Sequence, residues 1–353
     1  MWNCTNRCNL RCKHCYLAAG PQLESELLTA EAMRMIEEIG DMRVPIFGFT
    51  GGEPLVRDDF YVLSKHAVDE GLRVIVSSNG TLINRGRAEK LRDTGVRYVG
   101  ISLDGSSSRT HDTFREMPGS FDQAIEGIKA CLTVGLKTGI RVTITKHTYR
   151  EVPTILDLAQ RIGVPRVCFY YLVPSGRGRG IVEWDLTELQ RRNFLHFLYS
   201  RAKELYEKNI EILTVDGPMD GVYILQRLEE AEMRDDARKL LDLLGGCSAG
   251  IKICGIGPEG SVHPCQFMTE VTVGNVRERS LEEIWNDPDN EVLNMFRDKD
   301  KLKGKCGRCE YKAICGGCRI RAYQRFGDYL QEDPVCFYTP TGVLEAKSEG
   351  EAY

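Results

Sequence analysis

The chain has 353 residues, of which 42% are hydrophobic, and its formal net charge is −4. This length favours about two domains, and the slightly acidic balance argues against nucleic acid as a partner. The sequence holds no run of eighteen apolar residues and no secretory signal, so we expect no membrane-spanning helix and a cytoplasmic location.

Cysteine is frequent in this chain, with fourteen residues that fall mainly into two groups. In a short secreted protein such a number would predict disulfides, but in a long chain of cytoplasmic character it favours metal binding. The first group, Cys8, Cys12 and Cys15, has the spacing C-x3-C-x2-C. Three thiolates on one loop can hold three corners of a cuboidal iron–sulfur cluster and leave the fourth iron open for chemistry. The alternative is three unrelated structural cysteines.

Residues 1–172 alternate short apolar strands with amphipathic helices. Strands are expected at Trp2–Thr5, Pro45–Phe49, Arg73–Ser77, Tyr98–Ser102, Thr138–Thr145 and Arg166–Leu172. Helices are expected to begin near Thr29, Asp58, Arg85, Ser120 and Glu151. Six such repeats predict an α/β fold with a parallel sheet and right-handed crossovers. We interpret residues 1–180 as a partial (β/α)6 barrel of the TIM type.

A polar motif lies at the end of each predicted strand. The motifs are Cys8–Cys15, Thr50–Pro54, Ser77–Thr81, Ser102–Gly105, Arg141–Lys146 and Pro174–Gly180. The carboxyl ends of parallel barrel strands open on one face, where loops build active sites. We therefore expect the six motifs to converge in space.

Two of these motifs suit a small ligand. Gly51 and Gly52 allow the backbone to approach a ligand closely, and Glu53 is able to accept hydrogen bonds from a cationic amino group. Ser78 and Asn79 offer hydrogen bonds to a ribose or a carboxylate. Taken alone, Gly-Gly-Glu-Pro is an ordinary turn, but its position one strand after the cysteine triad favours ligand binding.

Three further residues are candidates for the chemistry itself. We expect Asp104 on the rim of the cavity, where it would orient a substrate. His147, at the end of the fifth strand, is a candidate iron ligand or proton donor. Arg177, together with Arg115 and Arg179, is suited to binding carboxylates.

The middle of the chain is charged and mostly helical in pattern. Amphipathic helices are expected over Leu186–Lys208 and Leu225–Leu244. We interpret residues 181–245 as a helical bridge that packs on the barrel, with its charges on a solvated face.

The second cysteine group marks a C-terminal domain at residues 246–340, followed by a tail at 341–353. Its members are Cys247, Cys254, Cys265, Cys306, Cys309, Cys315, Cys318 and Cys336. A hairpin is expected with arms at Lys252–Ile256 and Ser261–Pro264. Zinc is the alternative ligand, but the two C-x2-C pairs are five residues apart, where zinc sites usually have about 15–20. Eight cysteines are enough to close two iron–sulfur clusters.

With these motifs the sequence resembles the radical S-adenosylmethionine (SAM) enzymes, and its C-terminal segment resembles their SPASM extension. Cys315-Gly-Gly-Cys318 departs from the SPASM pattern by one missing spacer residue. The resemblance implies a SAM-binding [4Fe-4S] cluster on the first three cysteines, and one or two auxiliary [4Fe-4S] clusters. It also implies that SAM contacts Gly51, Gly52, Glu53, Ser78, Asn79 and Arg141. The implied auxiliary ligand sets are Cys247, Cys254, Cys265 and Cys318 for one cluster, and Cys306, Cys309, Cys315 and Cys336 for the other.

Three stretches resemble the branch that tailors tetrapyrroles in haem d1 biosynthesis and in the alternative, sirohaem-based haem pathway. They are Cys168–Gly180 with His111–Arg115, Cys247–Gly250 with Gly260–Gln266, and Gly304–Tyr311 with Cys315–Tyr323. The resemblance implies an iron tetrapyrrole substrate and favours conversion of didecarboxysirohaem to iron-coproporphyrin III. It implies a ferredoxin- or flavodoxin-type electron donor.

Three alternatives remain open. The chain would otherwise be a haem synthase that decarboxylates the propionates of iron-coproporphyrin III, or a peptide- or protein-modifying maturase. The non-enzyme alternative is an electron-carrying iron–sulfur or zinc module, against which the motifs at the second and third strand ends count.

Overall fold

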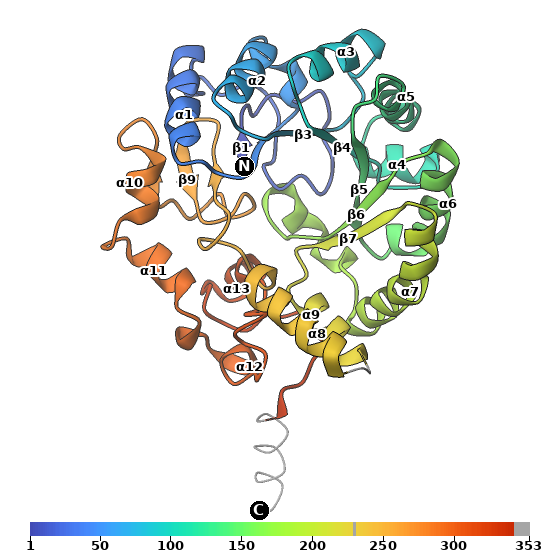
Figure 1. The fold of residues 1–353 in the computed structure, drawn as a ribbon, viewed down its shortest axis with the longest axis vertical. Helices are drawn as coiled ribbons and strands as arrows, with labels where there is room; N and C mark the ends of the chain where they lie inside the picture. The colour runs from blue at the N-terminus through green and yellow to red at the C-terminus, as the bar shows by residue number, and fades with distance from the viewer. Residues whose placement is uncertain (229–230, 342–353) are drawn as a thin grey trace, which may run out of the picture.

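The computed structural model describes residues 1–228 and 231–341, and its main feature is one ten-stranded sheet. The strand order is β10-β9-β8-β1-β2-β3-β4-β5-β6-β7, and the pairs from β1 to β7 are all parallel. The parallel strands curve around the molecule with helices on their outer side (Figure 1). The predicted α/β architecture with a partial barrel is therefore confirmed.

The barrel strands lie close to where the hydrophobic pattern predicts them. They are β1 (Trp2–Asn3), β2 (Phe47–Thr50), β3 (Val74–Ser78), β4 (Tyr98–Ser102), β5 (Thr138–Ile144), β6 (Arg166–Tyr171) and β7 (Glu211–Val215). The helices between and after them are α1 (Thr29–Asp41), α2 (Phe60–Asp69), α3 (Arg85–Asp93), α4 (Ser108–Arg115), α5 (Ser120–Thr133), α6 (Val152–Ile162) and α7 (Glu188–Glu207). The sequence pattern did not predict α4, whose eight residues are mostly polar.

The helices bury one apolar stripe against the sheet. In α1 the buried residues are Ala32, Met35, Ile36 and Ile39, which recur at the three- and four-residue spacing of one helix face. The sheet contributes buried apolar side chains to the same core, among them Phe49 and Val76.

The segment interpreted as a helical bridge also contributes a strand to the sheet. Residues Glu211–Val215 form β7, which pairs with β6 over five register positions. The helix expected over Leu225–Leu244 is divided into α8 (Met219–Arg227) and α9 (Ala231–Leu244). Because β7 lies at the sheet edge and none of its residues is fully buried, it lacks the strong apolar signal of the inner strands.

The C-terminal segment continues the same sheet. The expected hairpin forms from β8 (Gly255–Ile256) and β9 (Ser261–His263), and β8 pairs in parallel with β1. The remaining elements are β10 (Gly274–Asn275), α10 (Leu281–Asn286), α11 (Glu291–Arg297), α12 (Gly304–Gly307) and α13 (Arg319–Phe326). Figure 1 shows that this segment returns from α9 to lie beside the start of the barrel. The tail beyond residue 341 lies outside the described residues.

No helix among the residues that the structure describes combines the length and the apolar character needed to cross a membrane.

Aromatic side chains fill the core beneath the first two strands. Phe49 is fully buried, and its ring centroid lies 5.5 Å from Trp2, 5.2 Å from Phe47 and 5.3 Å from Phe60. Removal of this ring leaves a cavity that the neighbouring rings cannot fill.

We therefore expect Phe49→Ala to lower the free energy of unfolding by about 3–5 kcal/mol. Ile46→Ala is a suitable control, because Ile46 precedes the same strand and is 51% exposed, and it should change stability by less than about 0.5 kcal/mol. Anaerobic urea unfolding followed by far-UV circular dichroism measures both. Equal losses in the two variants would contradict the placement of Phe49 in the core.

Candidate active site

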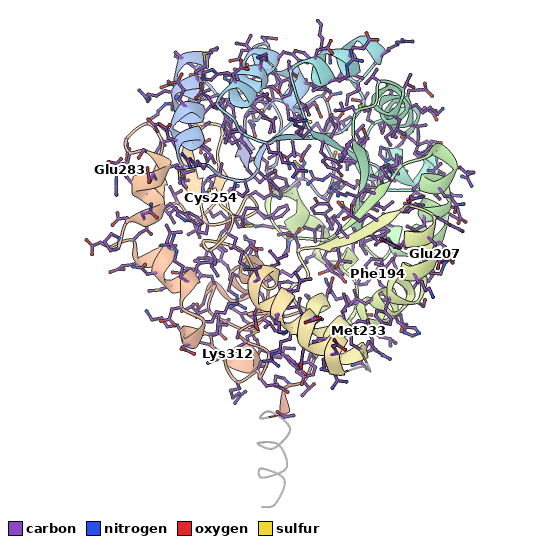
Figure 2. The ribbon with its side chains drawn as sticks, in the orientation of Figure 1. Phe194, Glu207, Met233, Cys254, Glu283 and Lys312 are labelled. Carbon is purple, nitrogen blue, oxygen red and sulfur yellow. The ribbon has the colours of Figure 1, made fainter. Side chains whose placement is uncertain are left out.

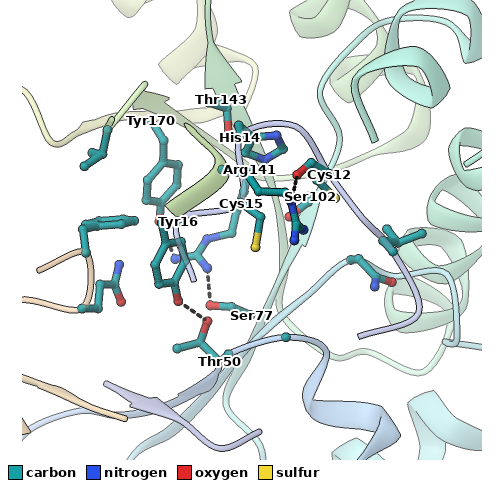
Figure 3. A pocket seen from close by; sticks show the side chains of 18 of the residues that line it. Cys12, His14, Cys15, Tyr16, Thr50, Ser77, Ser102, Arg141, Thr143 and Tyr170 are labelled. Carbon is teal, nitrogen blue, oxygen red and sulfur yellow. Dashed lines mark hydrogen bonds between the residues drawn. The ribbon is translucent and has the colours of Figure 1, made fainter. Parts of the chain in front are cut away.

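A cavity opens at the carboxyl ends of the barrel strands, where the polar motifs were expected to converge (Figure 3). The predicted site residues that line it are Cys8, Cys12, Cys15, Gly51, Gly52, Ser78, Asn79, Arg141 and Arg177. Loops after β1, β2, β3 and β6 and the strand β5 supply them. The predicted residues Glu53, Asp104 and His147 do not line this cavity.

The three cysteines lie on a loop that other elements hold in place. Arg177 donates from Nε to the carbonyl oxygen of Cys12 at 2.9 Å and from Nη1 to that of Ala19 at 2.7 Å. We expected Arg177 to bind carboxylates, but these two hydrogen bonds make it a clamp on the cysteine loop. Cys8 Sγ and Cys15 Sγ each accept a backbone N–H at 3.4 Å. Such N–H···S contacts are typical of cluster thiolates, so the loop fits an iron–sulfur cluster.

Gly51 and Gly52 bring the β2 loop against the cysteine loop. Gly52 N donates to Thr5 O at 2.8 Å, and Glu53 N donates to Arg7 O at 2.9 Å. A Cβ atom on Gly52 would lie 2.2 Å from Arg7 O, and Gly51 has φ +128°, which L side chains rarely adopt. The two glycines therefore fix the cysteine loop while their backbone faces the cavity.

The Glu53 side chain is fully buried and does not line the cavity. Its Oε1 accepts from Ser78 Oγ at 2.9 Å and from Leu55 N at 3.2 Å, and its Oε2 accepts from Asn79 N at 2.7 Å. Burial raises the pKa of Glu53, and these hydrogen bonds oppose that rise. Glu53 thus links the β2 and β3 loops, and its expected contact with the SAM amino group stays a prediction.

Asp104 and His147 also differ from expectation. Asp104 is fully buried instead of lying on the rim, because Thr143 N donates to its Oδ1 at 2.6 Å and Arg115 pairs with its Oδ2 at 2.5 Å. His147 packs edge-on against Trp184, with ring centroids 4.6 Å apart. Its position after β5 was predicted correctly, but it does not line the cavity.

Arg141 is directed into the cavity as expected (Figure 3). Its guanidinium donates to Ser77 Oγ and to the Tyr170 hydroxyl. Tyr16 also lines the cavity; it donates to Asn3 Oδ1 at 2.7 Å, and its oxygen lies 3.3 Å from Thr50 Oγ1. These contacts hold the polar lining in fixed positions.

The sequence reasoning missed several lining residues. His14 stacks on Phe114 at 4.3 Å, and burial lowers its pKa to about 3, which keeps the ring neutral. Its position in the sequence between Cys12 and Cys15 could have identified His14 as a residue of the cavity. Asp216 follows the unpredicted strand β7, and burial raises its pKa to about 7. No sequence signal marked this residue.

The second cysteine group forms two sites. Cys247, Cys265 and Cys318 line one cavity together with Asp216. Cys254 does not line it and packs against the barrel core instead, beside β9 (Figure 2). Burial raises the pKa of Cys265 most, and the nearby charges of Asp216, Cys247 and Cys318 raise it further. The charged group that acts on the pKa of Cys254 is instead the amino terminus. Cys254 therefore does not line the cavity of the other three cysteines, and its place in the implied set stays a prediction.

The other implied set is brought together. Its members, Cys306, Cys309, Cys315 and Cys336, line a separate cavity. Cys306, Cys309 and Cys315 each accept a backbone N–H at 3.3–3.4 Å, the same pattern as in the first loop. In the described ranges no three His, Cys, Asp or Glu side chains group tightly enough for a single metal ion. Cys4, Cys131 and Cys168 are buried, as expected; Cys131 lies in α5 and Cys168 in β6, whereas Cys4 follows β1.

The two cavities near Asp216 share a wall. Asp216, Gln266 and Phe267 line both the cavity of Cys8–Cys15 and the cavity of Cys247, Cys265 and Cys318. Asp216 Oδ2 and Gln266 Oε1 are buried, and neither has a hydrogen-bond partner among the described residues. Buried polar atoms usually have a hydrogen-bond partner, so these two atoms are suited to hydrogen bonding with a bound ligand.

Comparison with known proteins agrees with this arrangement. The radical SAM superfamily matches residues 2–159, and the SPASM iron–sulfur cluster-binding domain matches residues 247–310. A Methanosarcina barkeri protein named Fe-coproporphyrin III synthase is 39% identical over 96% of this chain and 87% of its own. A pre-heme d1 synthase of Dinoroseobacter shibae is 38% identical, with 96% and 86% covered. An AdoMet-dependent heme synthase of M. barkeri is 36% identical, with 96% of each chain covered.

A solved structure shares the fold. Streptococcus suis SuiB, crystallised with S-adenosylmethionine, superposes with a TM-score of 0.76 at 20% identity, over 95% of this chain and 76% of its own. The chain belongs to the radical SAM superfamily, as an enzyme of its haem-pathway branch with a C-terminal SPASM domain.

Proposed function

We propose that the protein removes the two acetate side chains of didecarboxysirohaem to give iron-coproporphyrin III. The observation that carries this proposal is its 39% identity, over nearly the whole of both chains, to a protein named Fe-coproporphyrin III synthase. When bound, the cluster and SAM supply a 5′-deoxyadenosyl radical that abstracts a hydrogen atom from the substrate. The chain's own residues hold these groups, position the substrate and exclude water.

Within this proposal the cavity lining divides into two parts. Cys8, Cys12 and Cys15 hold the cluster, and the backbone of Gly51 and Gly52 meets the amino group of SAM. Arg141, fixed by its two hydrogen bonds, offers its guanidinium to a carboxylate. Ser78 and Asn79 line the same side and contact the remainder of SAM. Glu53 acts through them as a positioning residue.

The substrate is proposed to lie against the wall shared by the two cavities. Asp216 and Gln266 present polar atoms there, and Phe267 presents a flat apolar ring. A tetrapyrrole combines a flat apolar macrocycle with polar carboxylate arms, so this lining fits its chemistry. Electrons enter from a ferredoxin- or flavodoxin-type donor. The auxiliary clusters either pass these electrons to the cavity or accept an electron from the substrate.

The substrate test compares two iron tetrapyrroles. Reduced enzyme with SAM should convert didecarboxysirohaem to iron-coproporphyrin III, detected by mass spectrometry as loss of both acetate arms. Iron-coproporphyrin III offered as substrate should remain unchanged. Conversion of iron-coproporphyrin III to haem would instead support the haem synthase step, and change in neither compound would reject the tetrapyrrole proposal.

The cluster assignment is tested by Cys12→Ala. Loss of one of three ligands should remove about four irons per chain and abolish formation of 5′-deoxyadenosine by the dithionite-reduced enzyme. Cys131→Ala is the matched control, because Cys131 is buried in α5 and is not among the proposed ligands, and its activity should stay within about twofold of wild type. Cleavage of SAM by Cys12→Ala would refute the assignment.

The separation of Cys254 gives a third prediction. Because Cys254 packs on the barrel core, Cys254→Ser should keep the iron content of the reconstituted wild-type protein. Cys265→Ser should lose about four irons, since Cys265 lies in the cavity with Cys247 and Cys318. Iron and sulfide analysis measures both. Equal iron loss in the two variants would place Cys254 among the ligands.

A further inference from the structure

Arg115 brings a buried positive charge to one of the three loop cysteines. It ends α4, is 7% exposed, and its Nη1 lies 3.5 Å from Cys12 Sγ, within reach of an N–H···S hydrogen bond. Cys8 and Cys15 accept from the backbone N–H groups of Leu10 and Ala19, which are neutral donors. Cys12 is therefore distinguished by a charged donor.

The guanidinium is held in place by a carboxylate behind it. Arg115 Nη2 lies 2.5 Å from Asp104 Oδ2, and Asp104 is fully buried. Thr143 N donates to Asp104 Oδ1 at 2.6 Å, which anchors the carboxylate to β5. Burial alone would raise the pKa of Asp104, but the Arg115 guanidinium and the hydrogen bond from Thr143 N oppose this rise, and that pKa is lowered. The order of groups is thus sulfur, positive charge, negative charge.

Other ionisable side chains around this pair do not reproduce its contact with the sulfur. His14 Nε2 lies 3.6 Å from Asp104 Oδ2, and its ring is neutral because burial lowers its pKa to about 3. The ring nitrogen Nδ1 of His111 accepts from Asp104 N at 3.0 Å, and burial lowers the pKa of His111 to about 4. Arg177 donates to the carbonyl oxygens of Cys12 and Ala19.

We propose that Arg115 and Asp104 form a charge pair that sets the reduction potential of the cluster. This inference rests on the proposed cluster at Cys8, Cys12 and Cys15. Reduction adds one electron from the external donor and so one negative charge to the cluster, with no bond made or broken. A positive charge against a ligand sulfur stabilises the reduced form more than the oxidised form and raises the potential. Asp104 lies behind it and limits this rise.

Removal of either charge should shift the midpoint potential in opposite directions. A purely structural role would not produce such opposite shifts. Arg115→Gln removes the positive charge and should shift the midpoint potential to more negative values. Asp104→Asn leaves the guanidinium without its counter-charge and should shift the potential to more positive values. Damage to the loop alone would lower iron retention in both variants and would not move the potential in opposite directions.

The test is a redox titration of the anaerobically reconstituted full chain, monitored by electron paramagnetic resonance. The relevant cluster is identified as the one whose signal changes when SAM is added. Arg115→Lys keeps the charge and should lie between wild type and Arg115→Gln. Arg179→Gln is the control, because Arg179 is half-exposed and pairs with Glu270, so solvent screens it and the potential should not move.

Wild-type potential in Arg115→Gln, with iron content retained, would overturn the inference. Shifts of one sign in Arg115→Gln and Asp104→Asn would overturn it as well. If Asp104→Asn fails to hold its clusters, the comparison of Arg115→Lys with Arg115→Gln still decides, since a shift of equal size in both rejects a charge effect. Absence of any SAM-sensitive signal in the wild type would reject the proposed cluster itself and with it this inference.

Discussion

The whole site depends on how the cysteine loop is held, because that loop has no regular secondary structure of its own. The β2 loop contacts it from one side through Gly52 N and Glu53 N, which donate to the carbonyls of Thr5 and Arg7. Arg177 contacts it from the other side through two carbonyl oxygens. Three thiols must stay at fixed separations to hold a cuboidal cluster, and a free loop would lose conformational entropy each time it did so. Backbone hydrogen bonds from the end of β2 and side-chain hydrogen bonds from the segment after β6 make that arrangement part of the folded state.

Buried carboxylates carry much of this support. Isolated burial of an ionised carboxylate is costly, and the cost falls when hydrogen bonds or an opposite charge satisfy it. Glu53 receives three hydrogen bonds that join the loops after β2 and β3, and Asp104 joins β5 to the end of α4 through Thr143 and Arg115. Each carboxylate therefore ties a loop of the cavity to a strand of the barrel. This is why both lie behind the cavity wall although their motifs lie at its edge.

The sequence predicted the fold better than it predicted side-chain directions. Apolar periodicity located the six barrel strands, and the glycine and cysteine motifs located their functional ends, because both signals are local. Whether a side chain points into the cavity or behind it depends on neighbours that are distant in sequence. Glu53, one residue after a cavity-lining glycine, is turned inward by Ser78 and Asn79. His147 is turned away by Trp184, and Cys254 is drawn to the barrel core by packing. Spacing alone contains none of these contacts.

Strand β7, which the sequence pattern did not predict, joins the two halves of the site. Strand β7 ends the parallel sheet and carries the chain directly to Asp216, whose φ of +64° turns it toward the C-terminal segment. Arg321 of α13 then donates to the carbonyl of Asp216 at 2.5 Å and to that of Leu172 at 3.4 Å. The C-terminal segment is thereby fixed to the ends of β6 and β7 as well as to β1. The cavity of the first cysteine loop and the cavity of Cys265 meet at the wall formed by Asp216, Gln266 and Phe267. A substrate held at that wall would lie between the two, so one binding position would serve both hydrogen abstraction and electron transfer.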